Sequence, residues 1–188
     1  MDKILIVKIG GKLINDSHVL HRFLKSFAKI KTKKILIHGG GNQVTKMCKK
    51  LNFDVKIRNG RRITSIQDLE VATMIYAGSL NKTLVTKLQS FNCNSIGLSG
   101  ADANLIESVK RPVKEIDYGL VGDIKKINSV FLKKLIDQNL TPVICSITHD
   151  KNGQLLNTNA DTISSEIAIS LSKYYIVNLI YCHEKNGV

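Results

Sequence analysis

Two clusters of glycine residues are the parts of the sequence best suited to chemistry. Gly10 and Gly11 follow one short apolar run, and Gly39, Gly40 and Gly41 follow another. Where a strand turns into a helix, consecutive glycines leave backbone N–H groups accessible, and the positive end of the helix dipole lies behind them. Each cluster therefore predicts an anion-binding turn. Two such turns at one edge of a sheet indicate phosphate chemistry, with two anionic ligands or one long ligand.

Two ionisable residues stand next to these clusters. Lys8 lies within the first apolar run, where a charged side chain is unfavourable unless it is used or paired. We therefore expect Lys8 to be functional. His38 directly precedes the second cluster, but no carboxylate or metal-ligating residue has a readable spacing to it. We therefore expect His38 to be structural.

Two widespread phosphate-binding motifs do not account for the clusters. The P-loop requires Ser or Thr after its Gly-Lys pair, whereas Gly11 and Lys12 are followed by Leu13. The dinucleotide-binding pattern G-x-G-x-x-G begins at Gly39 but has Val44 in place of its last glycine. The sequence therefore points to another kind of phosphate site.

Apolar runs at regular intervals predict the strands that would position these turns. Most are continuous rather than alternating, which is typical of parallel strands covered on both faces. The final predicted strand is followed by seven residues without a closing helix, so we expect the sequence to be C-terminally incomplete. The predicted strands are residues 3–9, 34–38, 54–57, 95–98, 142–147 and 175–181.

Segments with helical periodicity lie between these strands. Ser17 is expected to cap one helix, and Ser65 with Asp68 to form a capping box that opens a long helix through Leu88. Alternation of strand and helix predicts an α/β fold, a three-layer αβα sandwich on a mainly parallel open sheet. We expect a hairpin or lid within the polar residues 100–122. The other predicted helices cover residues 44–51, 130–136 and 161–172.

The composition excludes several classes of protein. With 188 residues, 43% apolar residues and two prolines, the chain is expected to form one ordered domain. The net charge of +13 comes mostly from lysines spread along the chain, without tryptophan and without basic residues interleaved with aromatic ones. We therefore expect the charge to gather anionic substrates and not to bind nucleic acid.

Targeting and cysteine patterns point to the cytoplasm. No apolar run is long enough for a signal peptide or a membrane span, so we expect no membrane association. The four cysteines form no C-x-x-C pair, which predicts reduced thiols and no protein-bound metal. They are Cys48, Cys93, Cys145 and Cys182.

Seven short segments, in order along the chain, together resemble the motifs of the amino acid kinase family. The resemblance covers essentially all of residues 1–188 and implies a single domain of that family. This domain would comprise the acyl-amino-acid-binding part and the start of the nucleotide-binding part. The segments are Lys8-Ile9-Gly10-Gly11, His38-Gly39-Gly40-Gly41, Asn59-Gly60-Arg61-Arg62-Ile63-Thr64, Tyr76-Ala77-Gly78 with Asn81-Lys82, Gly97-Leu98-Ser99-Gly100-Ala101-Asp102, Gly119-Leu120-Val121-Gly122-Asp123 and Leu156-Asn157-Thr158-Asn159-Ala160-Asp161.

Within the family, the resemblance implies transfer of the γ-phosphoryl group of ATP to the γ-carboxylate of N-acetyl-L-glutamate in arginine synthesis. A glutamyl carboxylate has a pKa near ~4.3, so it is already a nucleophile at neutral pH. Catalysis would therefore consist of positioning and charge neutralisation, with Mg²⁺ carried by the nucleotide. The resemblance also implies a homodimer through the helix 65–88, without feedback inhibition by arginine.

The same resemblance assigns roles to eight residues. The catalytic residues would be Lys8, which stabilises the transferring phosphoryl group, and Asp161, which orients catalytic lysines. Arg62 would hold the α-carboxylate with its planar guanidinium. The remaining assignments are Asn157, Gly40 and Gly41 to the acyl-amino acid and Gly10 and Gly11 to the phosphates of ATP.

Departures from the family pattern leave alternatives open. Members of the family continue beyond Val188 and carry a second catalytic lysine there, and a Thr/Ser-Asp pair often stands where this chain has Tyr181-Cys182-His183-Glu184. One alternative is a remnant that binds the amino acid without catalysis. Another is a sister kinase that acts on aspartate, glutamate, carbamate or UMP. The acyl group could also be larger than acetyl, for example succinyl.

Overall fold

The computed structural model describes residues 1–182, apart from the side chain of Lys12. Its centre is a five-stranded, fully parallel sheet in the order β11-β1-β2-β8-β5. The segment from His183 to Val188, part of the predicted C-terminal departure from the family pattern, lies outside the described residues. The strands of this sheet are β1 (Lys3–Ile9), β2 (Lys33–His38), β5 (Ser95–Leu98), β8 (Thr141–Cys145) and β11 (Ile176–Cys182).

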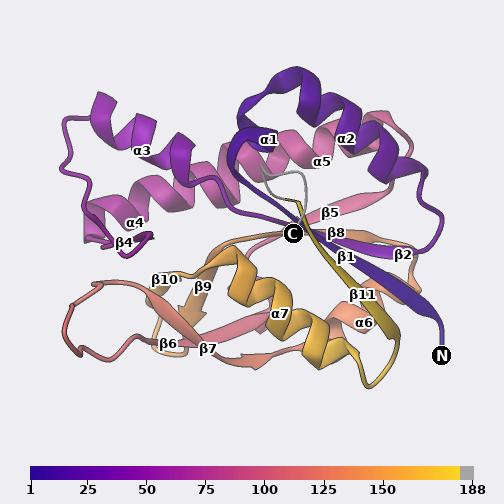
Figure 1. Cartoon of the computed structure of the whole chain (residues 1–188). Helices are drawn as coiled ribbons and strands as arrows, with labels where there is room; N and C mark the ends of the chain where they lie inside the picture. The colour runs from indigo at the N-terminus through magenta and orange to yellow at the C-terminus, as the bar shows by residue number, and fades with distance from the viewer. Residues whose placement is uncertain (183–188) are drawn as a thin grey trace.

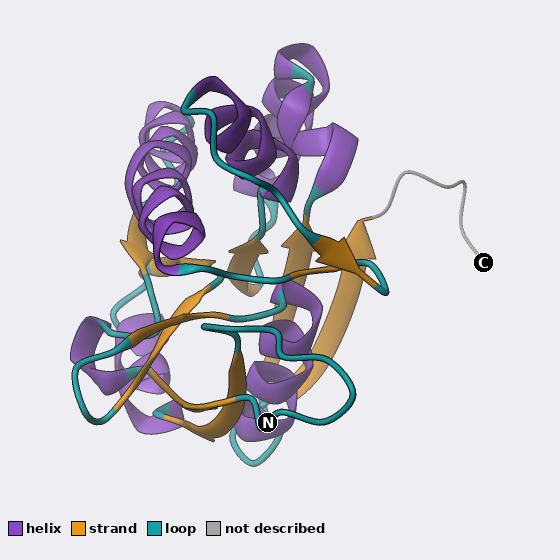
Figure 2. Cartoon of the chain, turned by 90° about the vertical axis from the view of Figure 1, so that its left-hand side faces the viewer, coloured by secondary structure: helices purple, strands orange, loops and turns teal. Residues whose placement is uncertain are grey.

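Helices cover both faces of this sheet, which confirms the predicted three-layer αβα sandwich (Figure 1). On one face, α2 (Ser17–Lys29) and α5 (Asn81–Ser90) pack with the short α1 (Gly11–Asn15). On the other face lie α6 (Ser129–Asp137) and α7 (Ala160–Leu171). In the view turned by 90°, helices lie on both sides of the strands (Figure 2). The alternation in β1 explains the layers, because Ile4 and Ile6 enter one core cluster and Val7 and Ile9 the other.

The helix boundaries follow from identifiable caps. Asp16, and not Ser17 as predicted, caps α2, because its carboxylate accepts the N–H groups of His18 and Val19. The predicted capping box of Ser65 and Asp68 is present at the start of α4 (Ile66–Thr73). The long helix that follows is continuous to Ser90 but contains a π-helical segment, η1 (Met74–Leu80), between α4 and α5.

A second sheet of four strands lies beside the first, in the order β10-β9-β6-β7. Strands β6 (Ile106–Lys110) and β7 (Gly122–Ile127) form an antiparallel hairpin, so the expected hairpin is present, but its second strand extends beyond the polar stretch 100–122. The predicted single strand 142–147 is two strands, because the chain leaves the central sheet at Ser146 and enters the second sheet as β9 (Ile147–Asp150). Strand β10 (Leu155–Asn157) completes this sheet.

The predicted strand 54–57 was wrong. Phe53 and Val55 lie outside any strand and pack against the cluster between α3 (Gly41–Lys50) and α4. Only β3 (Ile57–Arg58) pairs, with β4 (Arg61–Arg62), in an antiparallel hairpin of two residues each. The apolar alternation therefore reflects packing on helices and not a place in the sheet.

Candidate active site

A pocket of about 340 Å³ opens at the carboxyl ends of β1, β2 and β8. Ligands of open α/β sheets bind at this edge. The structure brings all eight residues predicted from the sequence into the lining of this one pocket. They are Lys8, Gly10, Gly11, Gly40, Gly41, Arg62, Asn157 and Asp161.

The two glycine turns enter the pocket as predicted, each between a strand and a helix. Gly11 is the first residue of α1, and Gly40 is the N-cap residue of α3. Gly40 has φ 147°, and no side chain caps the helix that follows it. The first N–H groups of α3 are therefore available to an anion. A Cβ atom at Gly40 would lie 2.8 Å from Leu80 Cδ2, so this turn accepts only glycine without rearrangement.

Lys8 and Asp161 form an ion pair in the pocket, with 2.9 Å between Lys8 Nζ and Asp161 Oδ1. The Lys8 side chain is 11% exposed, whereas that of Asp161 is 45% exposed. Asp161 is the second residue of α7, and the Asn159 side chain accepts its N–H group. A carboxylate in the first turn is favoured by the helix dipole. Gly10 leaves room for the ammonium group, because a Cβ atom there would lie 3.2 Å from Lys8 Nζ.

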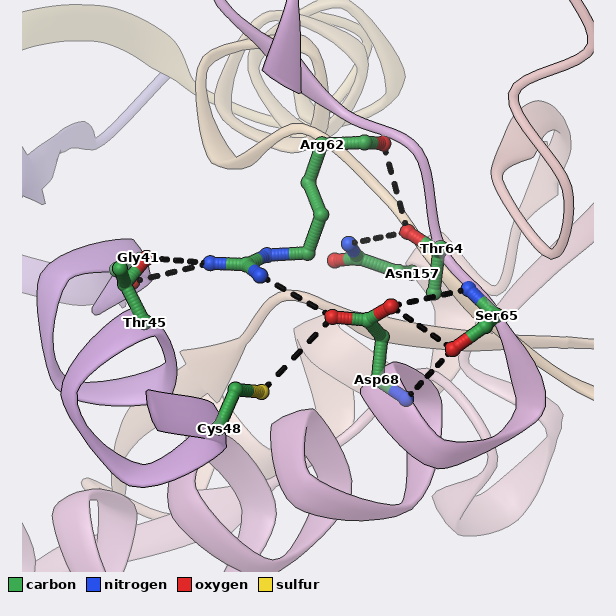
Figure 3. A network of polar contacts seen from close by, with 8 residues as sticks. All are labelled: Gly41, Thr45, Cys48, Arg62, Thr64, Ser65, Asp68 and Asn157. Atoms are coloured by element: carbon green, nitrogen blue, oxygen red, sulfur yellow. Dashed lines mark hydrogen bonds and ion pairs between the residues drawn. The ribbon is translucent and has the colours of Figure 1, made fainter. Parts of the chain in front are cut away.

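Arg62 is held by a network that fixes its guanidinium group (Figure 3). Its Nη1 donates to Asp68 Oδ1 at 3.0 Å, and its Nη2 donates to the hydroxyl of Thr45 and, at 3.4 Å, to the carbonyl of Gly41. Exposed fractions of 8% for the Arg62 side chain and 4% for the Asp68 side chain make this a buried ion pair. Arg62 thus differs from the solvated loop arginine that an Arg-Arg pair would suggest.

Asp68 joins this network to the start of α4. Its second carboxylate oxygen, Oδ2, accepts hydrogen bonds from the backbone N–H and the hydroxyl of Ser65. Cys48 Sγ lies 3.7 Å from Oδ1 of the same carboxylate, and burial together with this charge raises the pKa of the thiol. The sequence predicted Asp68 only as a cap. Its contact with Arg62 was missed, because it depends on how the β4 strand folds back over α4.

Asn157 lies at the end of β10 and lines the pocket beside the β3–β4 hairpin. Its Nδ2 donates to the hydroxyl of Thr64 at 3.0 Å, and Thr64 is fully buried. Asn157 is therefore a tethered side chain at the edge of the pocket, and not part of a free turn.

His38 has the structural surroundings expected from the sequence. It is fully buried, and burial lowers its pKa from 6.5 to about 4, so the ring is neutral at physiological pH. Asn81 Nδ2 donates to Nε2 at 3.1 Å, which assigns the proton to Nδ1 and directs it to the Gly39 carbonyl at 3.0 Å. The neutral ring thereby holds the Gly39 carbonyl, at the second glycine turn, by a hydrogen bond.

Arg111 and Tyr76 are among the lining residues to which the sequence assigned no role. Arg111 follows β6 and pairs with Asp123 on β7, with 2.6 Å between Nη2 and Oδ1. Its guanidinium lies 5.6 Å from the ring centre of Tyr118. Within the polar stretch 100–122 nothing singled Arg111 out, because only the hairpin brings it to the pocket. Tyr76 stood in one of the motif segments of the resemblance, but no role of its own was predicted from the sequence.

The charge of the pocket suits an anionic ligand. Among the described residues of the lining, the cations Lys8, Arg61, Arg62 and Arg111 face a single carboxylate, that of Asp161. No group of three or more His, Cys, Asp or Glu residues that could hold a metal ion occurs within residues 1–182. The arrangement can bind a polyanion and neutralise charge that develops between two anionic groups.

The sequence matches a protein-family model and known kinases over nearly its whole length. The model described as "Amino acid kinase family" matches residues 3–187. The acetylglutamate kinase of Cytophaga hutchinsonii is 50% identical over 189 residues, which cover 100% of this chain and 72% of that protein. That of Parabacteroides distasonis is 48% identical, covering 100% of this chain and 74% of the relative.

Solved structures show the same fold. The crystal structure of smu.665 from Streptococcus mutans UA159 has a TM-score of 0.83 and 25% identity, covering 98% of this chain and 76% of that one. The N-acetylglutamate synthase of Neisseria gonorrhoeae, complexed with coenzyme A and N-acetyl-glutamate, has a TM-score of 0.83 and 18% identity. There the match covers 98% of this chain and 42% of the synthase. No helix among the described residues is long and apolar enough to cross a membrane.

Proposed function

The chain belongs to the amino acid kinase family, and from this membership we propose that it phosphorylates the γ-carboxylate of N-acetyl-L-glutamate with ATP. The product is an acyl phosphate of arginine synthesis. The observation that supports this most is the cationic pocket that joins both glycine turns with the Lys8–Asp161 and Arg62–Asp68 pairs. The 50% identity to an acetylglutamate kinase over the whole chain supports the same substrate.

At the amino acid end, we assign the α-carboxylate of the substrate to Arg62. The guanidinium has more N–H donors than Asp68, Thr45 and Gly41 use, and a planar fork matches a carboxylate. Asn157 and the N–H groups at Gly40 and Gly41 would hold the rest of the acyl-amino acid. A substrate fixed in this way needs no general base, because its γ-carboxylate is ionised at neutral pH.

At the phosphoryl end, Lys8 neutralises charge that builds up as the γ-phosphoryl group passes between two anions. Asp161 keeps the ammonium group in place, and Gly10 and Gly11 supply backbone donors to the phosphates. Mg²⁺ would arrive on the nucleotide, which agrees with the described part of the lining, where the one carboxylate is already paired to Lys8. The metal would offset the charge of the triphosphate.

We also propose that residues 1–188 form one domain, that the protein acts in the cytoplasm, where ATP is available, and that it forms a homodimer. The helix that starts at Ser65 is the proposed interface, because it exposes the apolar side chains of Ile66 and Met74.

Trapping the acyl phosphate with hydroxylamine tests the proposed function. Purified protein with Mg·ATP and N-acetyl-L-glutamate is expected to form the hydroxamate, whereas aspartate and glutamate are expected to give none. With carbamate and UMP the readout is ADP formation, which is expected to stay at background. N-succinyl-L-glutamate in the same series defines the acyl group. A chain that N-acetylglutamate stabilises against heat but that forms no hydroxamate would be a binding protein without kinase activity.

A further inference from the structure

The hydroxyl of Tyr76 is a polar group of the pocket that has no hydrogen-bond partner among the described residues. Tyr76 is 5% exposed and lines the pocket. Within residues 1–182 no hydrogen bond to its Oη is formed. Buried polar groups are nearly always hydrogen-bonded, and those that are not within the protein face water or a ligand. In the described part of the chain, the fully buried side-chain atoms without a partner do not include Tyr76 Oη, so this hydroxyl opens to the pocket, where its partner is water or a ligand.

The ring of Tyr76 is fixed beneath the second glycine turn. A Cβ atom at Gly40 would lie 3.1 Å from Tyr76 Cε1, and one at Gly41 would lie 3.8 Å from Tyr76 Oη. Tyr76 belongs to the π-helical segment η1, and such wide turns often occur where a side chain serves a site. The hydroxyl is thus held beside Gly41, at the first turn of α3.

Arg62 reaches the same residue of the turn. Its Nη2 lies 3.4 Å from the Gly41 carbonyl, so Arg62 and Tyr76 flank one residue of the turn. Burial raises the pKa of Tyr76 to about 12, which keeps the hydroxyl protonated and able to donate at neutral pH. In a cationic pocket, the acceptor for this donor is an anionic oxygen.

We propose that the Tyr76 hydroxyl donates a hydrogen bond to the substrate carboxylate that Arg62 holds, and that it selects substrates carrying this carboxylate. The inference rests on the proposed function, because it takes the ligand to be an N-acylglutamate. It assigns to Tyr76 a direct contact with substrate, beyond its place in the helix.

The variant Tyr76→Phe removes only the oxygen and retains the ring that packs against Gly40. We expect the KM for N-acetyl-L-glutamate to rise about tenfold or more, as for loss of a hydrogen bond to a charged group, with the KM for ATP unchanged. The thermal midpoint without ligand should not fall, because no bond within the described protein is lost.

Tyr175→Phe is the matched control. Tyr175 is also buried, but its hydroxyl donates to Asp137 at 3.1 Å, outside the pocket. This variant should melt at a lower temperature and keep the KM for N-acetyl-L-glutamate. A purely structural role for Tyr76 would give the opposite pattern, with a lower midpoint and the same KM.

4-Acetamidobutyrate, which lacks the α-carboxylate, identifies the contacted group. The ratio of calorimetric affinities between wild type and Tyr76→Phe should be large for N-acetyl-L-glutamate and close to one for this analogue. Equal affinity of both proteins for N-acetyl-L-glutamate overturns the role of Tyr76 while leaving the kinase intact. Binding without turnover by the wild type overturns the kinase and still tests Tyr76, and absence of both binding and turnover overturns both.

Discussion

Each of three cations in the pocket is paired with a carboxylate that fixes its direction. Lys8 pairs with Asp161, Arg62 with Asp68 and Arg111 with Asp123. The pairs differ in burial, because only in the Arg62–Asp68 pair are both side chains below 10% exposed, at 8% and 4%. Removing one partner of a buried pair leaves an uncompensated charge, whereas a half-exposed partner can be solvated. A substitution in the half-exposed Lys8–Asp161 pair should therefore change the catalytic rate, and one in the buried Arg62–Asp68 pair should also lower the free energy of unfolding.

Lys8→Met should slow phosphoryl transfer strongly with little effect on folding. We expect kcat to fall by roughly 10²–10³-fold, the usual effect of losing a group that stabilises transition-state charge. The thermal midpoint should hardly change, because Asp161 is 45% exposed and water can replace its partner. Steady-state kinetics and a melting curve measure the two effects. Lys125→Met, at a 64% exposed lysine side chain paired with Glu107, is the control and should keep full activity.

Asp68→Asn should affect both stability and substrate binding. The free energy of unfolding is expected to fall by about 3 kcal/mol, because Arg62 remains charged and buried. The KM for the amino acid should rise, since the guanidinium loses the group that orients it. Urea denaturation and kinetics measure the two effects.

Ser65→Ala separates the two roles of Asp68. It removes the hydroxyl side of the capping box, which costs about 1 kcal/mol, and retains the Arg62–Asp68 pair. If both variants changed KM equally, Asp68 would act only through the cap.

At the scale of elements, the spacing of apolar residues predicted the helix from Ile66 to Ser90 but not the π-helical segment within it. Apolar positions recur every four residues from Ala72 to Leu88, and on an ideal α-helix this spacing drifts by about 40° per step. The π-helical segment η1 takes up this drift, so that Tyr76 and Leu80 meet the Gly40 turn while Leu84 and Leu88 reach the core. The signal for the wide turn was present in the spacing, but period alone predicted one uniform helix.

Continuous apolar runs predicted two strands of the central sheet with the observed boundaries, β1 and β5. The boundary between β8 and β9 could not be predicted, because Cys145, Ser146 and Ile147 are all buried although the strand neighbours change there. The predicted site residues do converge, because the glycine turns follow strands. The Arg62–Asp68 contact could not be predicted from the sequence, because it depends on the direction of the short β3–β4 hairpin.

Gly40→Ala should destabilise the turn that links β2 to α3. At φ 147° the added Cβ is strained and lies 2.8 Å from Leu80 Cδ2. We expect a loss of about 2–3 kcal/mol in the free energy of unfolding.

The control is Gly78→Ala, where a Cβ atom would meet open space within a helical segment. It should leave stability unchanged or raise it by up to about 1 kcal/mol. Chemical denaturation of both variants measures the difference, and equal stability would show that Gly40 is not constrained.

At the scale of the whole molecule, the buried ring of His38 makes the free energy of unfolding depend on pH. The folded pKa of about 4 lies below the ordinary value of 6.5, so the unfolded chain binds an extra proton between these values. The contribution to stability is complete above pH 6.5 and is lost as the pH falls toward 4. The difference corresponds to about 3 kcal/mol.

Urea denaturation between pH 7.5 and pH 4 measures this effect. The wild type should lose stability over that window, and His38→Gln should lose about 3 kcal/mol less. His21→Gln, on the exposed side of α2, is the control and should follow the wild type. Parallel curves for wild type and His38→Gln would exclude His38 as the titrating group.

Association of two chains is the other property of the whole molecule that can be tested. Analytical ultracentrifugation should give the wild type the mass of two chains, and Met74→Asp the mass of one, because a carboxylate would be buried without a partner in the proposed interface. Val130→Asp, at an exposed apolar position on α6, is the control and should remain dimeric. A monomeric wild type, or a dimeric Met74→Asp variant, would contradict the proposed interface.

The pairing of β1 with β11 has a consequence for how the protein is made. Lys3 is the register partner of Ile176. Strand β1 therefore lacks one of its two neighbours until β11, about 170 residues further along the chain, has been synthesised. At about 5–20 residues per second, ribosomes need roughly 10–30 s for that stretch. During this time one edge of β1 is an open, apolar template of unpaired N–H and C=O groups, the kind of edge at which nascent chains aggregate. Until β11 has been synthesised, aggregation through this edge is therefore expected to compete with folding.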